Sequence, residues 1–454
     1  MESRANTPDI KGQAISRRTF SKRTLAGIAG IAAAPMFMPQ TAKGANERLI
    51  LGLIGAGGMA THLSGRFGGA GIAAVCDVDL GRAGKLAERV GTKDVYQDYR
   101  KLLERDDIDA VVIATPQHWH ALQSIHAAQA GKDIYCEKPM TYSVVEGRRV
   151  VEAVRKYGCV FQTGSQQRSG HNEHTGITHV RNGTIGKITK VIASNYRSAQ
   201  RTRQPREKIP EELDWDMFCG PAIKPPYNFV IRDNGSKPSW SGIERFSGGD
   251  MADWGSHGLD LAQWGLGMDE SGPEEVWVEG EPFKPMYSTA ENPGERRGGP
   301  NKPTVFMTYP DGIVMEFTGH PESGVTFVGE KGQLRVTRGG YQSDPRELVR
   351  APLEDPGEEI YRGYQYALDT SHQQNWLDCV KDRSDPVASA EVGHRTATIC
   401  HLGNIARWVS EVTGETGNKL KWDAKKERFT NCELANSFYL DPPRRKGFEL
   451  PSKV

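Results

Sequence analysis

The sequence has 454 residues, enough for two or three domains, and its 37% hydrophobic and 25% charged residues are ordinary for a globular protein. The formal net charge is +1, but residues 1–45 carry seven Lys or Arg against two acidic residues, whereas the rest of the chain carries 51 basic against 55 acidic residues. This balance argues against a nucleic-acid partner, which requires a basic patch on the folded part of the chain.

Residues 1–45 have the pattern of an export signal. Paired arginines, Arg17 and Arg18, precede Phe20 and a short Ala-rich apolar run, Leu25–Met38. The run is too short and too weakly hydrophobic for a membrane span, whereas paired arginines before an apolar run are typical of a Tat signal. We therefore expect export by the Tat machinery to the periplasm or beyond it, with no membrane association. The alternative is a disordered basic N-terminus.

Residues 46–167 alternate short apolar runs with amphipathic stretches. Helices are predicted between the apolar runs, for example at Leu80–Val90 and His120–Ala130. The predicted strands are Leu49–Ile54, Ile72–Cys76, Ala110–Ala114, Asp133–Cys136 and Val160–Thr163. Apolar strands interleaved with helices indicate a parallel sheet covered on both faces. This region is therefore predicted to be an α/β domain with a doubly wound parallel sheet, a Rossmann dinucleotide-binding domain.

Residues 168–430 show a different pattern, which predicts a second, α+β domain with a largely antiparallel, open-faced sheet. Helical patterns cover Asp253–Trp264, His372–Val380 and Glu391–Val409, and we expect the last to pack back on the first domain. Residues 431–454 are predicted to be a loop-like tail. The predicted strands are Ile188–Tyr196, Glu275–Glu279, Thr304–Tyr309, Ile313–Thr318, Thr326–Gly329 and Gln333–Thr337.

A glycine-rich turn follows the first predicted strand and opens a helical stretch. Its residues are Gly55, Ala56, Gly57, Gly58, Met59 and Ala60. In a dinucleotide cradle the first glycine permits a tight turn, the second lets the backbone approach a pyrophosphate, and a small third residue packs the helix closely. Amide groups at the helix start then face the phosphates. The alternative is a generic strand–helix turn.

Asp77 ends the second strand about twenty residues later, where a carboxylate binds both ribose hydroxyls of a dinucleotide. Asp79 could share this role. An acid there repels a 2′-phosphate, so the sequence favours NAD over NADP, although Arg82 could still accommodate that phosphate.

Two further segments follow strands at the same edge of the predicted sheet, where loops line the ligand crevice. We expect Thr115, Pro116, His118 and His120 to line the cofactor pocket. The alternative for the two histidines is a metal pair, but nothing nearby completes the three or four ligands that zinc needs.

The second of these segments is Glu137-Lys138-Pro139. The ammonium group of Lys138 can hold a substrate hydroxyl and stabilise negative charge on oxygen during hydride transfer, and Glu137 can orient it. The alternative is a surface lysine before a proline turn.

Asp253 and His257 lie four residues apart, so on one helix they share a face. An imidazole titrates near neutrality and can take a proton from an alcohol as hydride leaves its carbon. Asp253 can bind an adjacent hydroxyl or tune that imidazole. Asp260, one turn further, could supplement the site. The alternative is a helix-capping aspartate with an ordinary histidine.

Other polar residues are expected at the substrate rim, with low specificity. Those singled out as substrate contacts are Gln166, Gln167, Arg168, Tyr196 and Arg197. A metal cluster could be formed by His171, Glu173, His174 and His179, but a polar helix start is favoured, and no metal site is predicted.

Together these motifs resemble the Gfo/Idh/MocA oxidoreductase family over roughly residues 47–410. The resemblance implies a Rossmann domain, an open-faced antiparallel sheet domain, and NAD(P)-dependent chemistry on sugars, inositols or their derivatives. In inositol-dehydrogenase-like members, the positions that match Lys138, Asp253 and His257 form the catalytic set. The open sheet face of this family often forms a dimer or tetramer, so a homo-oligomer is expected.

Export adds a constraint, because there is no ready NAD pool outside the cytoplasm. We therefore expect a tightly held cofactor and an NAD-dependent oxidoreductase that acts on a CH–OH group of a sugar, inositol or glycoside. The alternative is a glycoside hydrolase that works by transient oxidation, elimination and re-reduction, with His257 or Tyr196 as the base. The sequence lacks the Thr-His-Gly-type segment associated with N-acetylgalactosaminidase members. A non-catalytic sugar-binding protein would not need Lys138 and His257.

Overall fold

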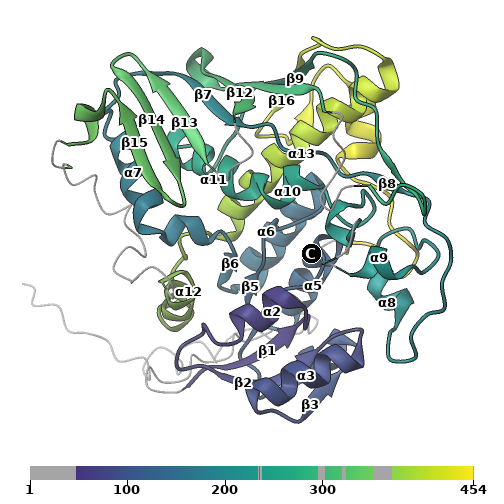
Figure 1. The fold of residues 1–454 in the computed structure, drawn as a ribbon. Coiled ribbons are helices and arrows are strands. Elements are labelled where there is room, and N and C mark those ends of the chain that lie inside the picture. Colours follow the sequence, from purple (N-terminus) through teal and green to yellow (C-terminus); the bar gives the residue numbers. More distant parts are fainter. Residues whose placement is uncertain are drawn as a thin grey trace, which may run out of the picture. The chain divides into compact units, whose positions relative to one another are not determined.

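The N-terminal half of the fold is built on a six-stranded parallel sheet with the strand order β3-β2-β1-β4-β5-β6 (Figure 1). The computed structural model describes residues 48–233, 235, 238–294, 302–319, 324–350, 353 and 371–452, so the predicted export signal lies outside the described residues. The strands are β1 Ile50–Ile54, β2 Gly71–Cys76, β3 Asp94–Tyr96, β4 Ala110–Ile113, β5 Asp133–Cys136 and β6 Phe161–Thr163. The helices are α2 Gly58–Leu63, α3 Leu80–Val90, α4 Tyr99–Leu103, α5 Gln117–Gln129 and α6 Val144–Tyr157.

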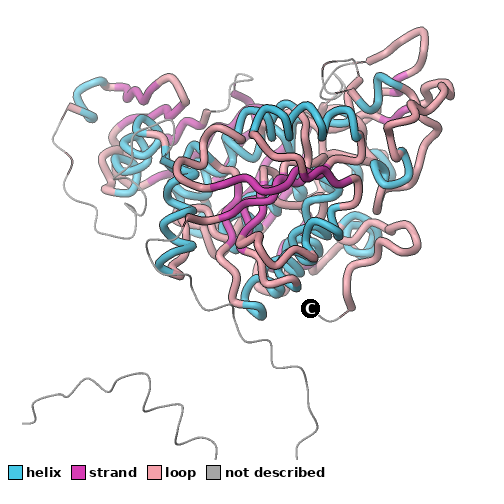
Figure 2. The backbone as a smooth tube through the Cα atoms, turned by 90° about the horizontal axis from the view of Figure 1, so that it is seen from below, coloured by secondary structure: helices cyan, strands magenta, loops and turns pink. Residues whose placement is uncertain are grey.

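Local signals explain why these elements begin and end where they do. Every residue of β4 and β5 is buried, as expected for central strands of a sheet covered on both faces. Helix α3 begins after Asp79, whose side chain accepts the backbone N–H of Arg82, and ends at Gly91 in the left-handed region. Helix α6 is likewise capped by Ser143 and ended by Gly158. Figure 2 shows the strands of this sheet flanked by helices.

The parallel doubly wound sheet is confirmed, with two differences in detail. Strand β3 was not predicted, because it has three residues, lies at the sheet edge and buries none of its side chains fully. Helix α5 begins at Gln117 rather than His120, since Pro116 occupies the position before its first turn.

The C-terminal half is built on a nine-stranded sheet with the order β15-β14-β13-β7-β12-β11-β9-β16-β17. All its neighbouring strands are antiparallel except β7 and β12, so the sheet is mixed and largely antiparallel. Its strands are β7 Ile188–Ser194, β9 Glu275–Glu279, β11 Thr304–Thr308, β12 Val314–Gly319, β13 Val325–Gly329, β14 Gly332–Thr337, β15 Gly340–Asp344, β16 Leu420–Asp423 and β17 Arg428–Phe429. A separate pair is formed by β8 Arg201–Thr202 and β10 Tyr287–Ser288.

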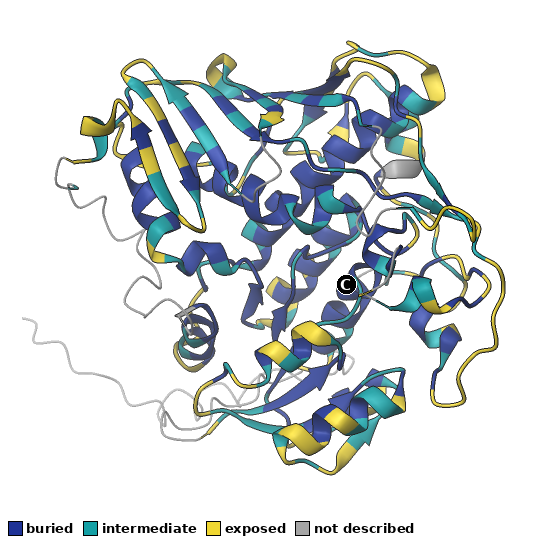
Figure 3. Cartoon of the chain, in the orientation of Figure 1, coloured by how far each residue is buried: buried dark blue, intermediate teal, exposed yellow. Residues whose placement is uncertain are grey.

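Helices cover one face of this sheet. The α-helices of this half are α7 His171–Arg181, α8 Trp215–Cys219, α9 Phe229–Arg232, α10 Asp250–Asp253, α11 Gly255–Leu266, α12 Ser371–Asp382 and α13 Ala390–Thr413. Shorter helical turns are η1 Gln166–Ser169, η2 Trp240–Gly242, η3 Pro310–Gly312, η4 Arg346–Val349 and η5 Ala435–Tyr439. Helices α7, α11 and α13 pack on the sheet, while alternate residues of β14 and β15 face outward and are exposed or half-buried (Figure 3).

Helix α13 packs on both halves, as predicted, because it contacts α6 and β6 of the first sheet domain as well as α11 and β9. Two expectations were wrong. Helix α12 packs its Trp376 and Leu377 into the core of the first domain rather than the second. The C-terminal tail contains the π-helical turn η5, so it is not loop throughout. None of the described helices combines the length and the apolar character that a membrane crossing requires.

A buried ion cluster ties η1 to helices α11 and α13. Arg168 donates to both carboxylate oxygens of Asp260 at 2.8–2.9 Å and to Asp269 at 2.7–3.0 Å, and its side chain is 3% exposed. Thr396 of α13 donates its hydroxyl to the same Asp260 at 2.7 Å. Such a cluster stabilises the fold only while every charge keeps its partner.

Replacing Arg168 by Met is expected to lower the free energy of unfolding by about 3–5 kcal/mol, because Asp260 then remains buried without its cation. Arg149→Met is the matched control, since Arg149 and its partner Glu152 are 35% and 46% exposed, and such a pair contributes about 0–1 kcal/mol. Denaturant titration of both variants measures the difference. Equal losses in the two variants would contradict the structural role of Arg168.

Candidate functional site

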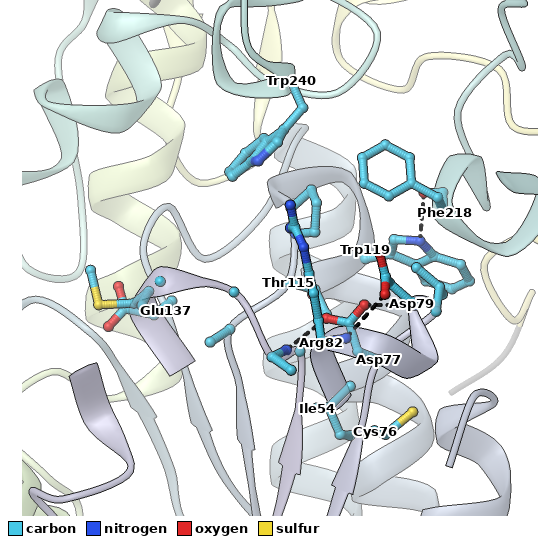
Figure 4. A pocket seen from close by; sticks show the side chains of 18 of the residues that line it. Ile54, Cys76, Asp77, Asp79, Arg82, Thr115, Trp119, Glu137, Phe218 and Trp240 are labelled. Atoms are coloured by element: carbon cyan, nitrogen blue, oxygen red, sulfur yellow. Dashed lines mark hydrogen bonds between the residues drawn. The ribbon is translucent and has the colours of Figure 1, made fainter. Parts of the chain in front are cut away.

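A cavity of about 540 Å³ opens at the carboxyl edge of the parallel sheet. The loops that follow β1, β2, β4 and β5 form one side, and segments of the second half, including Phe218 and Trp240, form the other. Figure 4 shows Asp77, Asp79 and Arg82 together in this cavity, with Glu137 set apart from them and Trp240 across from the strand ends. This is the crevice in which doubly wound sheets bind ligands.

The glycine-rich turn leaves open space at its centre. Gly55 has φ +100°, and a Cβ there would lie 2.7 Å from the carbonyl oxygen of Ala114, so only glycine fits. A Cβ on Gly57 or Gly58 would meet no atom within 4 Å. All residues from Gly55 to Met59 line the cavity, so backbone amides border a space that a pyrophosphate can enter.

Asp77 fixes this turn to the end of β2. One of its carboxylate oxygens accepts the backbone N–H of Ala56 at 2.7 Å, and the other accepts that of Asp79 at 2.9 Å. Burial raises the pKa of Asp77, while nearby Arg82 and Arg232 oppose that rise. The carboxylate lies at the cavity wall, as predicted, and retains lone pairs for ligand hydroxyls.

Arg232 was not anticipated at this end of the cavity. It forms an ion pair with Asp79, and Arg82 lies 3.6 Å from Asp233, so each arginine has an acidic neighbour. Arg232 belongs to α9, more than 150 residues after Asp77 in the chain, inside a segment with no motif. No local signal in the sequence could have placed it there.

The Thr115–His120 segment divides between two environments. Thr115, Pro116 and His120 line the cavity as predicted, and the two ring nitrogens of His120 lie 2.7 and 2.8 Å from the carbonyl oxygens of Pro139 and Thr115. His118 does not line this cavity: its Nε2 faces the Phe218 carbonyl oxygen at 2.9 Å, and the ring packs beside Phe246. The expectation that His118 lines the cofactor pocket is therefore wrong, because its position on α5 turns it toward α8.

Lys138 and Asp253 meet across 115 residues of sequence. The ammonium Nζ of Lys138 forms an ion pair with Asp253 Oδ1 and donates to its backbone carbonyl at 3.2 Å. Both side chains are nearly buried, 12% and 17% exposed, and both line the cavity at the Glu137 end. The family resemblance assigned both residues to one catalytic set, and the fold brings their side chains into contact.

Glu137 is held behind Lys138. Its carboxylate accepts from the side-chain amide of Gln166 at 2.9 Å and from the backbone N–H of Lys138 at 3.2 Å. Burial raises the pKa of Glu137 to about 7, and the adjacent Lys138 opposes this rise. Glu137 therefore orients the peptide of Lys138, whereas Asp253 orients its ammonium group.

His257 lies on a different helix from Asp253, because α10 ends at Asp253 and α11 begins at Gly255. The expectation of one shared helix face was therefore too simple. His257 Nε2 lies 3.0 Å from an Nη atom of Arg338, whose guanidinium also lies over the Trp254 ring. Arginine has donors only, so Nε2 accepts and the proton of the neutral ring resides on Nδ1.

One predicted substrate residue, Gln167, connects to His257 through Glu173 and Arg338. Gln167 hydrogen-bonds the carboxylate of Glu173, and Arg338 exerts a favourable charge interaction on that same carboxylate. Gln167, Glu173, Arg338 and His257 thus form one polar cluster, and none of these four residues lines the cofactor cavity. Arg338 lies in the hairpin turn between β14 and β15, directly before Gly339-Gly340. The two glycines indicate a turn in the sequence, but they do not indicate which residues the turn will contact.

Four other candidate site residues make contacts within the fold. Arg168 and Asp260 are committed to the buried ion cluster, so neither is available to a substrate. Tyr196 is 4% exposed in the core of the second domain, with its hydroxyl against Gly258, and burial raises its pKa. Arg197 contributes its carbonyl to the N–H of Met251. The expectation that Arg168 and Tyr196 contact substrate is wrong.

The histidines of α7 do not converge. His174 packs against Trp264, and His179 faces the hydroxyl of Thr184 at 3.3 Å. Among the residues that the structure describes, no three His, Cys, Asp or Glu side chains gather in a way that could hold a metal ion.

The raised pKa of Glu137 makes stability depend on pH. The folded protein binds this proton more tightly than the unfolded chain, so the stabilisation is fully present below the unfolded value of 4.5 and is lost as pH rises through about 7. Relative to Glu137→Gln, the wild type should lose on the order of 3 kcal/mol of unfolding free energy over that window. Denaturant titrations between these pH values measure the loss. The control is Glu88→Gln, because Glu88 is exposed. If the difference in unfolding free energy between wild type and Glu137→Gln did not change with pH, Glu137 would be solvated and the prediction would be wrong.

Known proteins resemble this chain in both halves. Residues 49–165 match the model "Oxidoreductase family, NAD-binding Rossmann fold" of Gfo/Idh/MocA proteins, and residues 180–450 match the model "Oxidoreductase family, C-terminal alpha/beta domain" of the same group. The residues that line the cavity fit such a cofactor, because open space borders the glycine turn and a carboxylate stands at its end.

Relatives agree with these matches. An inositol 2-dehydrogenase of Rubrobacter xylanophilus is 36% identical over 149 residues, 32% of this chain and 43% of the relative. A 2,7-anhydro-N-acetylneuraminate hydratase of Mediterraneibacter gnavus is 31% identical over 153 residues, 33% of this chain and 40% of the relative. The chain thus spans less than half the length of these two curated relatives.

The fold is shared over a longer range. The WlbA dehydrogenase of Bordetella pertussis, solved with NADH and UDP-GlcNAcA, is similar with a TM-score of 0.57 and 19% identity, over 83% of this chain and 99% of that one. The two family models together account for nearly all the described residues. The chain belongs to the Gfo/Idh/MocA family of oxidoreductases with an NAD-binding Rossmann fold.

Proposed function

We propose that this protein is an NAD-dependent oxidoreductase that transfers hydride between its cofactor and a CH–OH carbon of a sugar, inositol or glycoside. The observation that carries the proposal is Lys138, held by Asp253 at one end of a dinucleotide-sized cavity whose other end holds Asp77. A cavity that needed only to bind a ligand would not require a nearly buried ammonium group fixed by a carboxylate from a second domain. The inositol 2-dehydrogenase relative supports the substrate class.

The cofactor, when bound, supplies the hydride acceptor. Lys138 Nζ then donates a hydrogen bond to the substrate oxygen and stabilises negative charge on it, and Asp253 keeps that donor in place. His257 Nε2 carries the lone pair that accepts the hydroxyl proton. Arg338 covers this nitrogen in the structure, so substrate must displace the guanidinium before the proton moves.

NAD rather than NADP is the proposed cofactor. Asp77 stands at the cavity wall, and its charge disfavours a 2′-phosphate. The two arginines near it are engaged with Asp79 and Asp233, which reduces the positive potential that such a phosphate would need. We further propose that residues 1–45 direct Tat export to the periplasm and that the cofactor stays bound during turnover.

A second candidate is redox-neutral chemistry, in which oxidation, elimination and re-reduction occur at one site. The hydratase among the relatives supports this second candidate, because hydration involves no net oxidation. The base for the elimination would be His257, since Tyr196 is buried in the core and its pKa is raised. In this case too, the cofactor would not need to exchange.

Cell fractionation followed by denaturation tests cofactor and location together. We expect the mature protein in the periplasm, with near-stoichiometric NAD identified by mass after unfolding. Asp77→Ala should release less NAD, because the ribose loses its acceptor. NADP in place of NAD would contradict the role of Asp77. A cytoplasmic protein that retains residues 1–45 would contradict export but leave the reaction class standing.

Lys138→Met should abolish turnover while the same nucleotide is still released on denaturation. The expected loss in kcat is on the order of 10²–10⁴-fold, the range for a group that acts directly on the reacting oxygen. The assay follows NADH formation, or label exchange for a redox-neutral reaction, over a panel of inositols, aldoses and glycosides. Lys101→Met, an exposed lysine of α4, is the control. Unchanged turnover in Lys138→Met would remove this lysine from the mechanism.

A further inference from the structure

A second cavity, of about 440 Å³, lies behind helix α5 and shares no lining residue with the cofactor cavity. Consecutive residues of α5 face the two spaces: Gln117 and Trp119 line the first, and His118 lines the second. Helix α13, the strand pair β8–β10, the loop at residues 243–245 and the tail at residues 442–444 complete the second cavity. Its volume is in the range of sites for small ligands.

The floor of this second cavity includes an uncharged ring. His401 of α13 is 5% exposed, and one ring nitrogen hydrogen-bonds the backbone of Thr141. Its Nε2 is buried, out of reach of a ligand in the cavity. Burial lowers the pKa of His401 to about 3, so the ring is neutral near pH 7. The charged groups that a ligand would meet are therefore the other residues of the lining.

The mouth of the second cavity has an excess of positive charge. Four arginines line it against two glutamates, Glu146 and Glu244. Arg201 is held by Glu244 and Glu411, and Arg444 by Glu146 and Asp441.

The remaining two arginines, Arg203 and Arg245, are exposed and form no ion pair with a carboxylate in the described parts of the chain. Arg203 lies 4.1 Å above the Tyr287 ring, which holds its guanidinium at the rim. Two such cations in the lining of one cavity favour an anionic group.

The walls between floor and mouth are aromatic and apolar. Tyr142, Tyr287 and Trp408 line the cavity together with Ile223, Ile243 and three prolines. Tyr142 donates its hydroxyl to the Glu244 carbonyl, which fixes its ring in the wall. Rigid rings with a few polar groups at fixed points are typical of sites that bind compact organic ligands.

We propose that this second cavity binds a small organic anion, a sugar-sized ring bearing a carboxylate or phosphate group. The ring lies between the aromatic walls, and the anionic group pairs with Arg203 and Arg245 at the mouth. The site is separate from the one that holds Lys138, so this proposal stands or falls independently of the proposed reaction.

Isothermal titration of the full-length protein with its resident nucleotide tests the proposal. The probes are D-glucuronate, D-glucose 6-phosphate and neutral D-glucose. We expect at least one anion to bind at least about 10-fold more tightly than glucose, since a charge-assisted contact is worth roughly that factor. The tighter of the two anions identifies the anionic group.

Variants locate the binding. Arg203→Gln combined with Arg245→Gln should weaken the bound anion at least about 10-fold, whereas Arg350→Gln, an exposed arginine elsewhere, should not. Lys138→Met should leave the affinity unchanged, which separates this cavity from the reaction site. Glucose bound as tightly as the anions, an unaltered affinity in the double variant, or no binding of either anion would overturn the proposal.

Discussion

The ion pair between Lys138 and Asp253 is the interaction on which the rest of this site depends. A nearly buried ammonium group is costly unless a carboxylate compensates it, and removing either partner leaves an uncompensated charge. The lysine comes from the loop after β5 of the first domain, and the aspartate from the end of α10 in the second. The pair therefore joins the two domains where the cofactor cavity ends.

Other contacts keep the lysine loop in one conformation. Glu137 accepts the N–H of Lys138, the His120 ring touches the Pro139 carbonyl, and Thr141 is engaged by His401. Each of these contacts comes from a buried side chain. A donor that must stabilise charge on a substrate oxygen works best when it is already in place, and this loop supplies that preorganisation. Arg338, in contrast, is exposed at the turn after β14, which suits a residue that substrate displaces.

Much of the first domain could be predicted from sequence because its signals are local. A glycine turn after a strand, and an aspartate at the end of the next strand, lie within about twenty residues, and strand order then fixes their geometry. The Lys138–Asp253 contact spans 115 residues, and it was anticipated through the family resemblance rather than through spacing. Arg232 and Arg338 carry no motif, so only the folded chain reveals that they meet Asp79 and His257.

The wrong expectations share one cause. Arg168, Tyr196 and His118 are residue types that often contact ligands, but their polar groups are used inside the protein. Sequence shows that a charge or a ring is present, whereas only packing shows whether its partners are protein atoms. The predicted single helix from Asp253 to Trp264 failed for a related reason, because periodicity does not report the break at Trp254.

A crystal structure of the protein with bound NAD would show whether the Lys138–Asp253 pair borders the reacting end of the cofactor. We expect the nicotinamide ring at the Lys138–Asp253 end of the cavity, with the ribose near Asp77. The ring should leave a space of about 3–3.5 Å for a substrate carbon within reach of Lys138 Nζ and His257 Nε2. A nicotinamide ring bound elsewhere, with the Lys138–Asp253 pair sealed away from it, would contradict a role of Lys138 in hydride transfer.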